Sequence, residues 1–177
     1  MNMNDLLSRV QQKENDFLVG RDSETEQYLR FLKGETVDDK SIWNVFGTGG
    51  VGKSTLLDTM RRMSIGQDCV FLYLDSRDFH HTHDELCTRL LQQCPAPSLT
   101  HNTDYSNLTE SFLYKIQELS QSTRVTIAFD TYEEMDDLDT WLREQLIQWL
   151  PNAVLVVIAG RNPLKGQWQL SPAWRER

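Results

Sequence analysis

Short apolar runs alternate with amphipathic stretches along most of the chain. Four runs end in turn or helix signals, and they lie at residues 42–46, 69–74, 125–129 and 153–159. The last three are continuously apolar, which is typical of strands that are covered on both faces. Between the runs, apolar residues recur at helical spacing. This order predicts an α/β fold with three layers, in which a mainly parallel sheet has helices on both faces.

Capping signals indicate where several of the helices begin. The S/T-x-x-E spacing of a capping box occurs at residues 23–26, 82–85 and 131–134, and an apolar stripe follows each of them. The last stripe runs from Met135 to Trp149 and predicts a helix that buries this face. We expect the Ser or Thr of each box to accept a hydrogen bond from the backbone of its helix.

Length and composition are those of one globular domain. The chain has 177 residues, of which 39% are hydrophobic and 25% are charged. Its formal net charge of −8 argues against a protein that mainly coats nucleic acid or an anionic membrane. The longest apolar run is too short to span a bilayer, and the amino-terminal residues lack the pattern of a secretory signal. We therefore expect a cytoplasmic, water-soluble protein with reduced thiols.

A glycine-rich motif directly follows the first predicted strand. It matches G-x-x-x-x-G-K-[ST], and residues with a helical pattern come after it. Glycines allow the left-handed backbone conformations in which successive N–H groups surround a polyphosphate. The next helix adds its free amino-terminal donors and its dipole. The nucleotide-binding residues expected here are Gly47, Thr48, Gly49, Gly50, Val51, Gly52, Lys53, Ser54 and Thr55.

Side chains in and beyond this motif predict a metal–nucleotide site. The Lys53 ammonium suits the β- and γ-phosphates, and the Ser54 hydroxyl suits Mg²⁺. Such a site also needs a carboxylate at the carboxyl end of a neighbouring strand. Asp130 comes directly after the third apolar run and fits that position. We expect ATP or ADP as the nucleotide, with Mg²⁺ held by Ser54 and Asp130.

Beyond Lys53 and Asp130, the sequence leaves two candidate catalytic residues, each with an alternative role. Many ATPases place a glutamate directly after the strand-end aspartate, but Thr131 stands there. Glu133 is either the catalytic base or a solvated surface acid. Arg161 closes the fourth predicted strand, where it either senses the γ-phosphate or is an exposed strand-end residue. Asp75, Arg77 and Asp78 follow the second strand and predict a solvated turn, with a protein contact as the alternative.

The sequence resembles the STAND class of P-loop ATPases. The resemblance rests on the glycine-rich motif, on Asp130 and Arg161, and on the upstream segment Phe17-Leu18-Val19-Gly20-Arg21-Asp22. These ATPases are relatives of the AAA+ proteins and of the NACHT and NB-ARC switch domains. The resemblance implies that Val19, Gly20 and Arg21 help to enclose the base. It also implies a strand order of 5-1-4-3-2.

The same resemblance divides the chain into three segments. Residues 1–16 are expected to be an amino-terminal helical segment, residues 17–161 the P-loop NTPase core, and residues 162–177 a carboxyl-terminal tail. No fifth strand is evident in the tail, which is also too short for the helical lid and winged-helix region of this class. We therefore expect a core cut from a longer protein, or a minimal relative.

By this resemblance the chain is the ATP- and Mg²⁺-binding domain of a signalling switch. Slow hydrolysis would control conformation or oligomerisation, and protein partners would bind through regions outside this chain. Because Thr131 occupies the usual base position, a nucleotide-dependent scaffold without hydrolysis is the alternative. A small-molecule kinase is disfavoured because no Arg-rich lid follows the core, and a GTPase because no N-K-x-D motif occurs.

Overall fold

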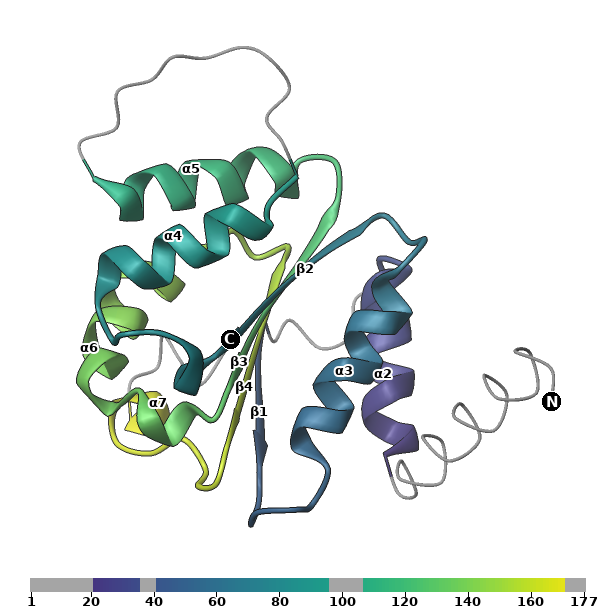
Figure 1. Cartoon of the computed structure of the whole chain (residues 1–177). Helices are drawn as coiled ribbons and strands as arrows, with labels where there is room; N and C mark the ends of the chain where they lie inside the picture. Colours follow the sequence, from purple (N-terminus) through teal and green to yellow (C-terminus); the bar gives the residue numbers. More distant parts are fainter. Residues whose placement is uncertain (1–20, 36–40, 96–106, 171–177) are drawn as a thin grey trace, which may run out of the picture.

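The computed structural model describes residues 21–35, 41–95 and 107–170. In Figure 1 a central sheet separates helices α2 and α3 from helices α4 to α7. Four parallel strands form the sheet in the order β1-β4-β3-β2. The strands are β1 (Ile42–Phe46), β2 (Cys69–Asp75), β3 (Arg124–Asp130) and β4 (Val154–Gly160). The predicted three-layer α/β fold is confirmed, and each strand lies close to its predicted bounds.

Parallel pairing brings the carboxyl ends of the strands to one edge of the sheet. Phe46 of β1 pairs with Gly160 of β4, and Asp75 of β2 pairs with Asp130 of β3. The predicted order is therefore confirmed for the first four strands. A fifth strand does not occur in the part of the chain that the structure describes. In open parallel sheets, the edge at which the strands end is the usual place for ligands.

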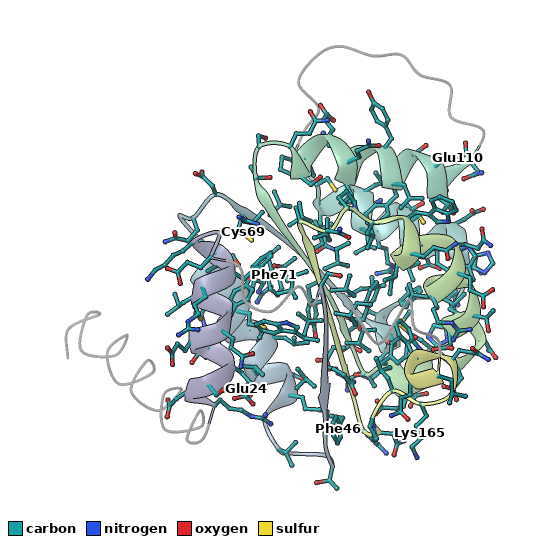
Figure 2. All side chains as sticks on the ribbon, turned by 180° about the vertical axis from the view of Figure 1, so that it is seen from behind. Glu24, Phe46, Cys69, Phe71, Glu110 and Lys165 are labelled. Carbon is teal, nitrogen blue, oxygen red and sulfur yellow. The ribbon has the colours of Figure 1, made fainter. Side chains whose placement is uncertain are left out.

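Two apolar cores hold the helices against the sheet. The larger core lies under α4 (His83–Gln93) and α5 (Leu108–Ser120), and the smaller under α2 (Asp22–Leu32) and α3 (Lys53–Ser64). In the smaller core, the buried Tyr28 hydroxyl is 2.6 Å from the Ser64 hydroxyl and 3.0 Å from that of Thr126. Figure 2 shows Phe71 on the same side of the sheet. These contacts join α2 and α3 to the sheet.

Of the three predicted capping residues, only Thr82 caps its helix as expected, while the Glu85 side chain accepts from the His80 backbone N–H and not from that of Thr82. The Thr82 hydroxyl accepts a hydrogen bond from the backbone N–H of Glu85, at 3.3 Å. Helix α2 begins at Asp22, so Ser23 lies inside the helix and does not cap it. Thr131 does not cap a helix either, because its backbone is left-handed, with φ 55° and ψ 42°.

The predicted helical stretch that begins at Met135 is present and buries Met135, Leu138, Leu142 and Leu146, but it is a succession of short helical turns and not one regular α-helix. They are the 3₁₀ turns Tyr132–Glu134 and Asp136–Leu138, helix α6 (Asp139–Trp141), the π-helical turn Leu142–Leu146 and the 3₁₀ turn Ile147–Trp149. A π-helical turn holds more residues than an α-helical one, so side chains beyond it face a different direction. Trp149 is accordingly 65% exposed and not on the buried stripe. Helix α7 (Gln167–Leu170) follows β4. Among the described residues, every helix is too short or too polar to cross a membrane.

Candidate nucleotide-binding site

The loop between β1 and α3 forms an open cradle. It spans residues 47–52, and α3 begins directly after it. Gly50 and Gly52 both have φ of 84°, a left-handed conformation that L-amino acids with side chains rarely adopt. At Gly50 a Cβ would meet no atom within 4 Å, so the backbone conformation and not the space requires glycine there. A hollow of about 460 Å³ lies against residues 50–55.

The first turn of α3 adds groups that suit an anion. The first N–H groups of a helix lack partners within it, and this first turn holds no acidic residue. The Lys53 ammonium donates to the carbonyl oxygens of Gly47, at 2.7 Å, and Thr48, at 3.1 Å. Ser54 is exposed at the hollow, and Thr55 also lines it. A cation, hydroxyl groups and backbone donors therefore surround one hollow.

Asp130 ends β3 at the same edge of the sheet. The residue is only 2% exposed, yet its carboxylate meets no cationic hydrogen-bond donor among the described residues. One oxygen accepts from the backbone N–H of Thr131, at 2.8 Å, and the other from the Tyr73 hydroxyl, at 3.1 Å. Each oxygen keeps a lone pair for a further ligand. Carboxylate and hydroxyl oxygens are hard ligands, so the donor set of Asp130 and Ser54 fits Mg²⁺.

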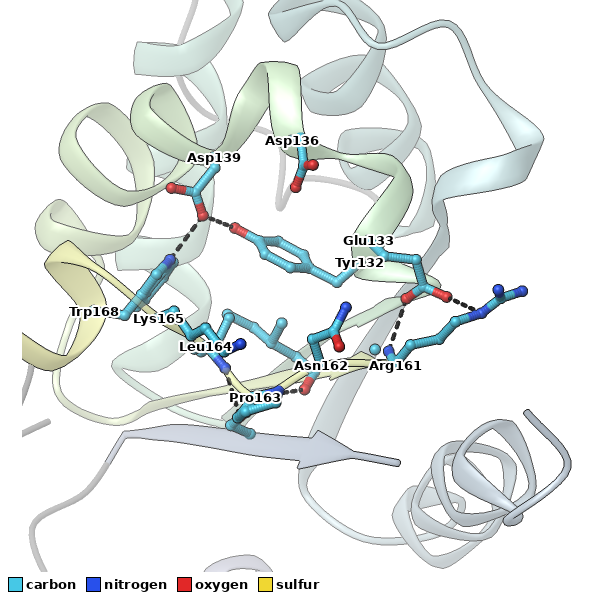
Figure 3. Close-up of a pocket in the computed structure, with 13 residues that line it drawn as sticks. Tyr132, Glu133, Asp136, Asp139, Arg161, Asn162, Pro163, Leu164, Lys165 and Trp168 are labelled. Atoms are coloured by element: carbon cyan, nitrogen blue, oxygen red, sulfur yellow. Dashed lines mark hydrogen bonds and ion pairs between the residues drawn. The ribbon is translucent and has the colours of Figure 1, made fainter. Parts of the chain in front are cut away.

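Glu133 and Arg161 bind each other beside the cradle. Thr131 is the one non-glycine residue with positive φ among the described residues, and the chain turns there toward the end of β4. The Glu133 carboxylate accepts from the Arg161 backbone N–H, at 3.0 Å, and from its Nε, also at 3.0 Å (Figure 3). The Glu133 side chain is 20% exposed and that of Arg161 is 68% exposed. Glu133 is therefore partly buried and ion-paired with Arg161.

The ends of β1 and β4 are joined where the cradle begins. The backbone N–H of Gly47 donates to the carbonyl of Gly160, at 3.2 Å. Arg161 follows Gly160, so the pair of Glu133 and Arg161 stands close to the start of the cradle. A second cavity of about 280 Å³ opens on the other side of this pair, toward Trp168 (Figure 3). Figure 2 shows Phe46 and Lys165 at this same end of the sheet.

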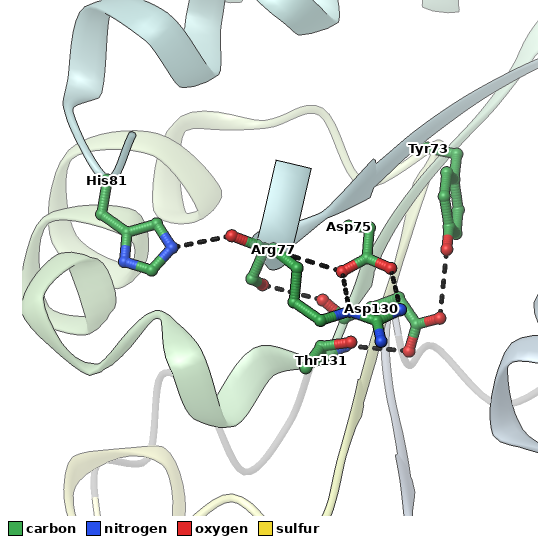
Figure 4. Close-up of polar contacts among 7 residues, drawn as sticks. Tyr73, Asp75, Arg77, His81, Asp130 and Thr131 are labelled. Carbon is green, nitrogen blue, oxygen red and sulfur yellow. Dashed lines mark hydrogen bonds and ion pairs between the residues drawn. The ribbon is translucent and has the colours of Figure 1, made fainter. Parts of the chain in front are cut away.

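The turn after β2 is only partly the solvated turn that the sequence predicts, because Arg77 and Asp78 are exposed whereas Asp75 is buried. Asp75 is only 7% exposed, and Arg77 donates three hydrogen bonds to its carboxylate (Figure 4). They come from the backbone N–H at 3.0 Å, Nε at 2.9 Å and Nη2 at 2.5 Å. The hydrogen bonds from the Arg77 side chain hold the pKa of Asp75 below its usual value. Asp75 and Arg77 thus belong to the candidate site.

Tyr73 was also missed by the sequence reasoning. Burial, and then the charge of Asp130, raise the pKa of Tyr73 above its usual value, so its hydroxyl remains a donor. A signal did exist, since Tyr73 lies two residues before the strand-end Asp75 and therefore points to the same face of the sheet. Using that signal requires the register of β2 against β3, which the sequence pattern does not give.

Arg21 is the part of the upstream segment that the structure describes. Its Nη1 pairs with Glu24 at 2.6 Å, and its Nη2 lies 3.5 Å from the carbonyl oxygen of Val51 in the cradle. Arg21 therefore borders the cradle. Val19 and Gly20, the other two residues expected in that role, lie outside the described residues.

Comparison with known proteins supports the fold. No protein-family model matches the chain, and no curated protein matches its sequence. Cdc6p from Pyrobaculum aerophilum is similar in structure, with a TM-score of 0.54 at 16% identity over 89% of this chain and 43% of that one. The Aeropyrum pernix ORC2 protein, solved as ADPNP–ADP complexes, has a TM-score of 0.51 at 17% identity over 81% and 41%. The chain thus spans less than half the length of either.

The four parallel strands in the order β1-β4-β3-β2 match the core of AAA+ ATPases. The chain therefore has the fold of a P-loop NTPase.

Proposed function

We propose that this chain binds ATP with Mg²⁺ and hydrolyses it slowly. The observation that carries the proposal is the glycine cradle at the start of α3, which opens at the sheet edge where Asp130 ends β3 and Arg161 follows β4. Cradles of this kind bind phosphate through main-chain donors and the helix terminus. The AAA+ fold and the nucleotides in the similar ORC2 structure support the same ligand class.

Binding assigns a role to each part of the cradle. The backbone N–H groups of residues 47–52 and the first turn of α3 surround the β- and γ-phosphates. The Lys53 ammonium exchanges a loop carbonyl for phosphate oxygens, since it already lies over the loop. Ser54 and Asp130 are the residues that would hold Mg²⁺. When bound, the metal neutralises charge on the phosphate oxygens.

Hydrolysis needs the pair of Glu133 and Arg161 to separate. While both oxygens of Glu133 accept from Arg161, the carboxylate is a poor acceptor for a proton from water. Release makes Glu133 a general base and leaves the Arg161 guanidinium free for the γ-phosphate. Because the resting contact favours the paired form, we expect slow turnover of the isolated chain.

We propose further that this ATPase works as a STAND-type switch. In that role Val19, Gly20 and Arg21 enclose the base, and nucleotide controls conformation or self-association through regions outside this chain. The contact of Arg21 with the cradle supports the first part. Thr131 in the usual base position favours the alternative, a scaffold that binds nucleotide without hydrolysis.

Single-turnover phosphate release from the full chain tests the hydrolysis. We expect Glu133→Gln to lower the release rate by about a hundredfold, as is usual for loss of a general base, while ATP affinity stays unchanged. Glu134→Gln is the matched control, because Glu134 is the exposed neighbour of Glu133. No release from the wild-type chain would favour the scaffold. Equal release from wild type and Glu133→Gln would remove Glu133 from the mechanism.

A further inference from the structure

Two carboxylates lie side by side at the edge of the sheet that faces the cradle. Asp75 and Asp130 are register partners on the adjacent parallel strands β2 and β3, whose backbones are about 4.8 Å apart. Both residues are almost fully buried, at 7% and 2% exposure. Two neighbouring carboxylates with little contact with water repel each other strongly, and together they attract a cation.

The structure gives these two carboxylates different partners. Asp75 is wrapped by the backbone and guanidinium of Arg77, so its hydrogen-bonding capacity is largely filled and its charge is balanced (Figure 4). Asp130 accepts from Tyr73 and Thr131, both of which are uncharged donors. The charge of Asp75 is therefore balanced by Arg77, whereas the carboxylate of Asp130 has no cationic hydrogen-bond partner among the described residues and can bind a metal ion.

The turn that carries Arg77 is fixed against β3. The Ser76 hydroxyl donates to the carbonyl oxygen of Asp130, at 2.7 Å, and a ring nitrogen of His81 lies 2.8 Å from the Ser76 carbonyl. Arg77 itself keeps a side chain that is 64% exposed, so its guanidinium is not held by packing. Its place is set by the Asp75 carboxylate and by the turn.

We propose that Arg77 masks Asp75, so that the site presents Asp130 as its single metal-binding carboxylate. Arg77 is then a positioning residue, which acts on the metal through Asp75 and does not touch the nucleotide. The inference deepens the proposed function, since it concerns the metal at the same site. Without the mask, Asp75 and Asp130 together would hold a divalent cation even in the absence of nucleotide.

Binding of Mn²⁺ to the full chain without nucleotide tests the mask. We expect Arg77→Gln to raise Mn²⁺ affinity by about tenfold or more, because it uncovers a second carboxylate beside Asp130. The double variant Asp75→Asn/Arg77→Gln should return to the wild-type affinity. Arg89→Gln is the matched control, because Arg89 also pairs with a carboxylate of its own segment, that of Glu85. Unchanged Mn²⁺ affinity in Arg77→Gln would overturn the proposal.

ATP affinity measured without a divalent cation separates masking from direct contact. If Arg77 masks Asp75, Arg77→Gln weakens Mg²⁺-free ATP binding by repulsion, and the double variant restores it. Equal weakening in Arg77→Gln and in the double variant would show that Arg77 contacts the nucleotide, which contradicts the proposal. If the wild-type chain binds no ATP, the proposed function fails while the Mn²⁺ experiment still tests the mask.

Arg77→Lys is a second variant that controls for a folding defect in Arg77→Gln. It keeps the positive charge beside Asp75 but loses the planar fork. We expect its Mn²⁺ affinity to stay within about threefold of wild type, since the mask acts mainly through charge. A tenfold rise in Arg77→Lys would contradict that mechanism. Thermal unfolding of each variant establishes that folded protein is compared.

Discussion

Glu133 and Arg161 hold each other in a contact that neither can keep while acting on a nucleotide. Both groups on Arg161 that bond to Glu133 are donors, and one of them, Nε, belongs to the guanidinium that would reach the γ-phosphate. In the proposed mechanism, the γ-phosphate would compete with the Glu133 carboxylate for the Arg161 guanidinium. At the scale of single residues, this exchange would link the presence of a third phosphate to the release of the proposed base.

Arg161→Gln should reduce the preference of the chain for ATP over ADP. We expect ATP affinity to fall about tenfold, as for loss of a charge-assisted hydrogen bond, while ADP affinity stays the same because ADP lacks the γ-phosphate. Competition of ATP and ADP against a fluorescent nucleotide measures both. An equal fall for the two nucleotides would mean that Arg161 does not sense the γ-phosphate.

Asp75 should contribute to the pH dependence of stability. Its pKa is lowered in the folded protein, chiefly by hydrogen bonds from the Arg77 side chain. The stability from Asp75 is therefore fully present above the unfolded-state pKa, about 3.9, and is lost as the pH falls through the lower folded-state value. Asp75→Asn should flatten the loss of stability below about pH 4, as measured by urea unfolding between about pH 2 and 6. Identical acid profiles would contradict this role.

At the scale of elements, apolar runs predicted the strands well because burial on both faces requires them. The helix starts were less predictable. Acidic Asp22 and Glu24 in the first turn of α2 favour an earlier start than Ser23, and the left-handed Thr131 prevents a cap. The π-helical turn after α6 displaces Trp149 from the predicted stripe. The left-handed Thr131 and the π-helical turn depend on tertiary packing that a short sequence window does not contain, whereas the two acidic residues of α2 are visible in the sequence.

Thr82 and Ser23 give a paired test of the caps. Thr82→Ala should lower the free energy of unfolding by about 1 kcal/mol, because it removes the acceptor of the Glu85 backbone N–H. Ser23→Ala should change it by less than about 0.5 kcal/mol, since Ser23 caps nothing. Urea unfolding of the two variants measures both values. A larger loss in Ser23→Ala than in Thr82→Ala would contradict the assigned helix starts.

At the scale of the whole molecule, parallel pairing explains how residues from distant parts of the sequence form one site. The cradle, Asp130 and Arg161 were predictable, because a glycine-rich motif and polar residues at strand ends are visible in the sequence. The contacts of Tyr73 with Asp130 and of Glu133 with Arg161 were not predictable. They depend on strand register and on the left-handed turn at Thr131, which no local pattern encodes.

Calorimetric titration of the full chain with Mg·ATP decides whether the cradle binds a triphosphate. We expect saturable binding by the wild-type chain and a loss of at least about tenfold in affinity for Lys53→Ala, which removes the cation over the loop. Lys33→Ala, at the exposed end of α2, should bind as the wild type does. No heat from the wild-type chain, or equal affinity in Lys53→Ala, would contradict the assignment of a nucleotide site.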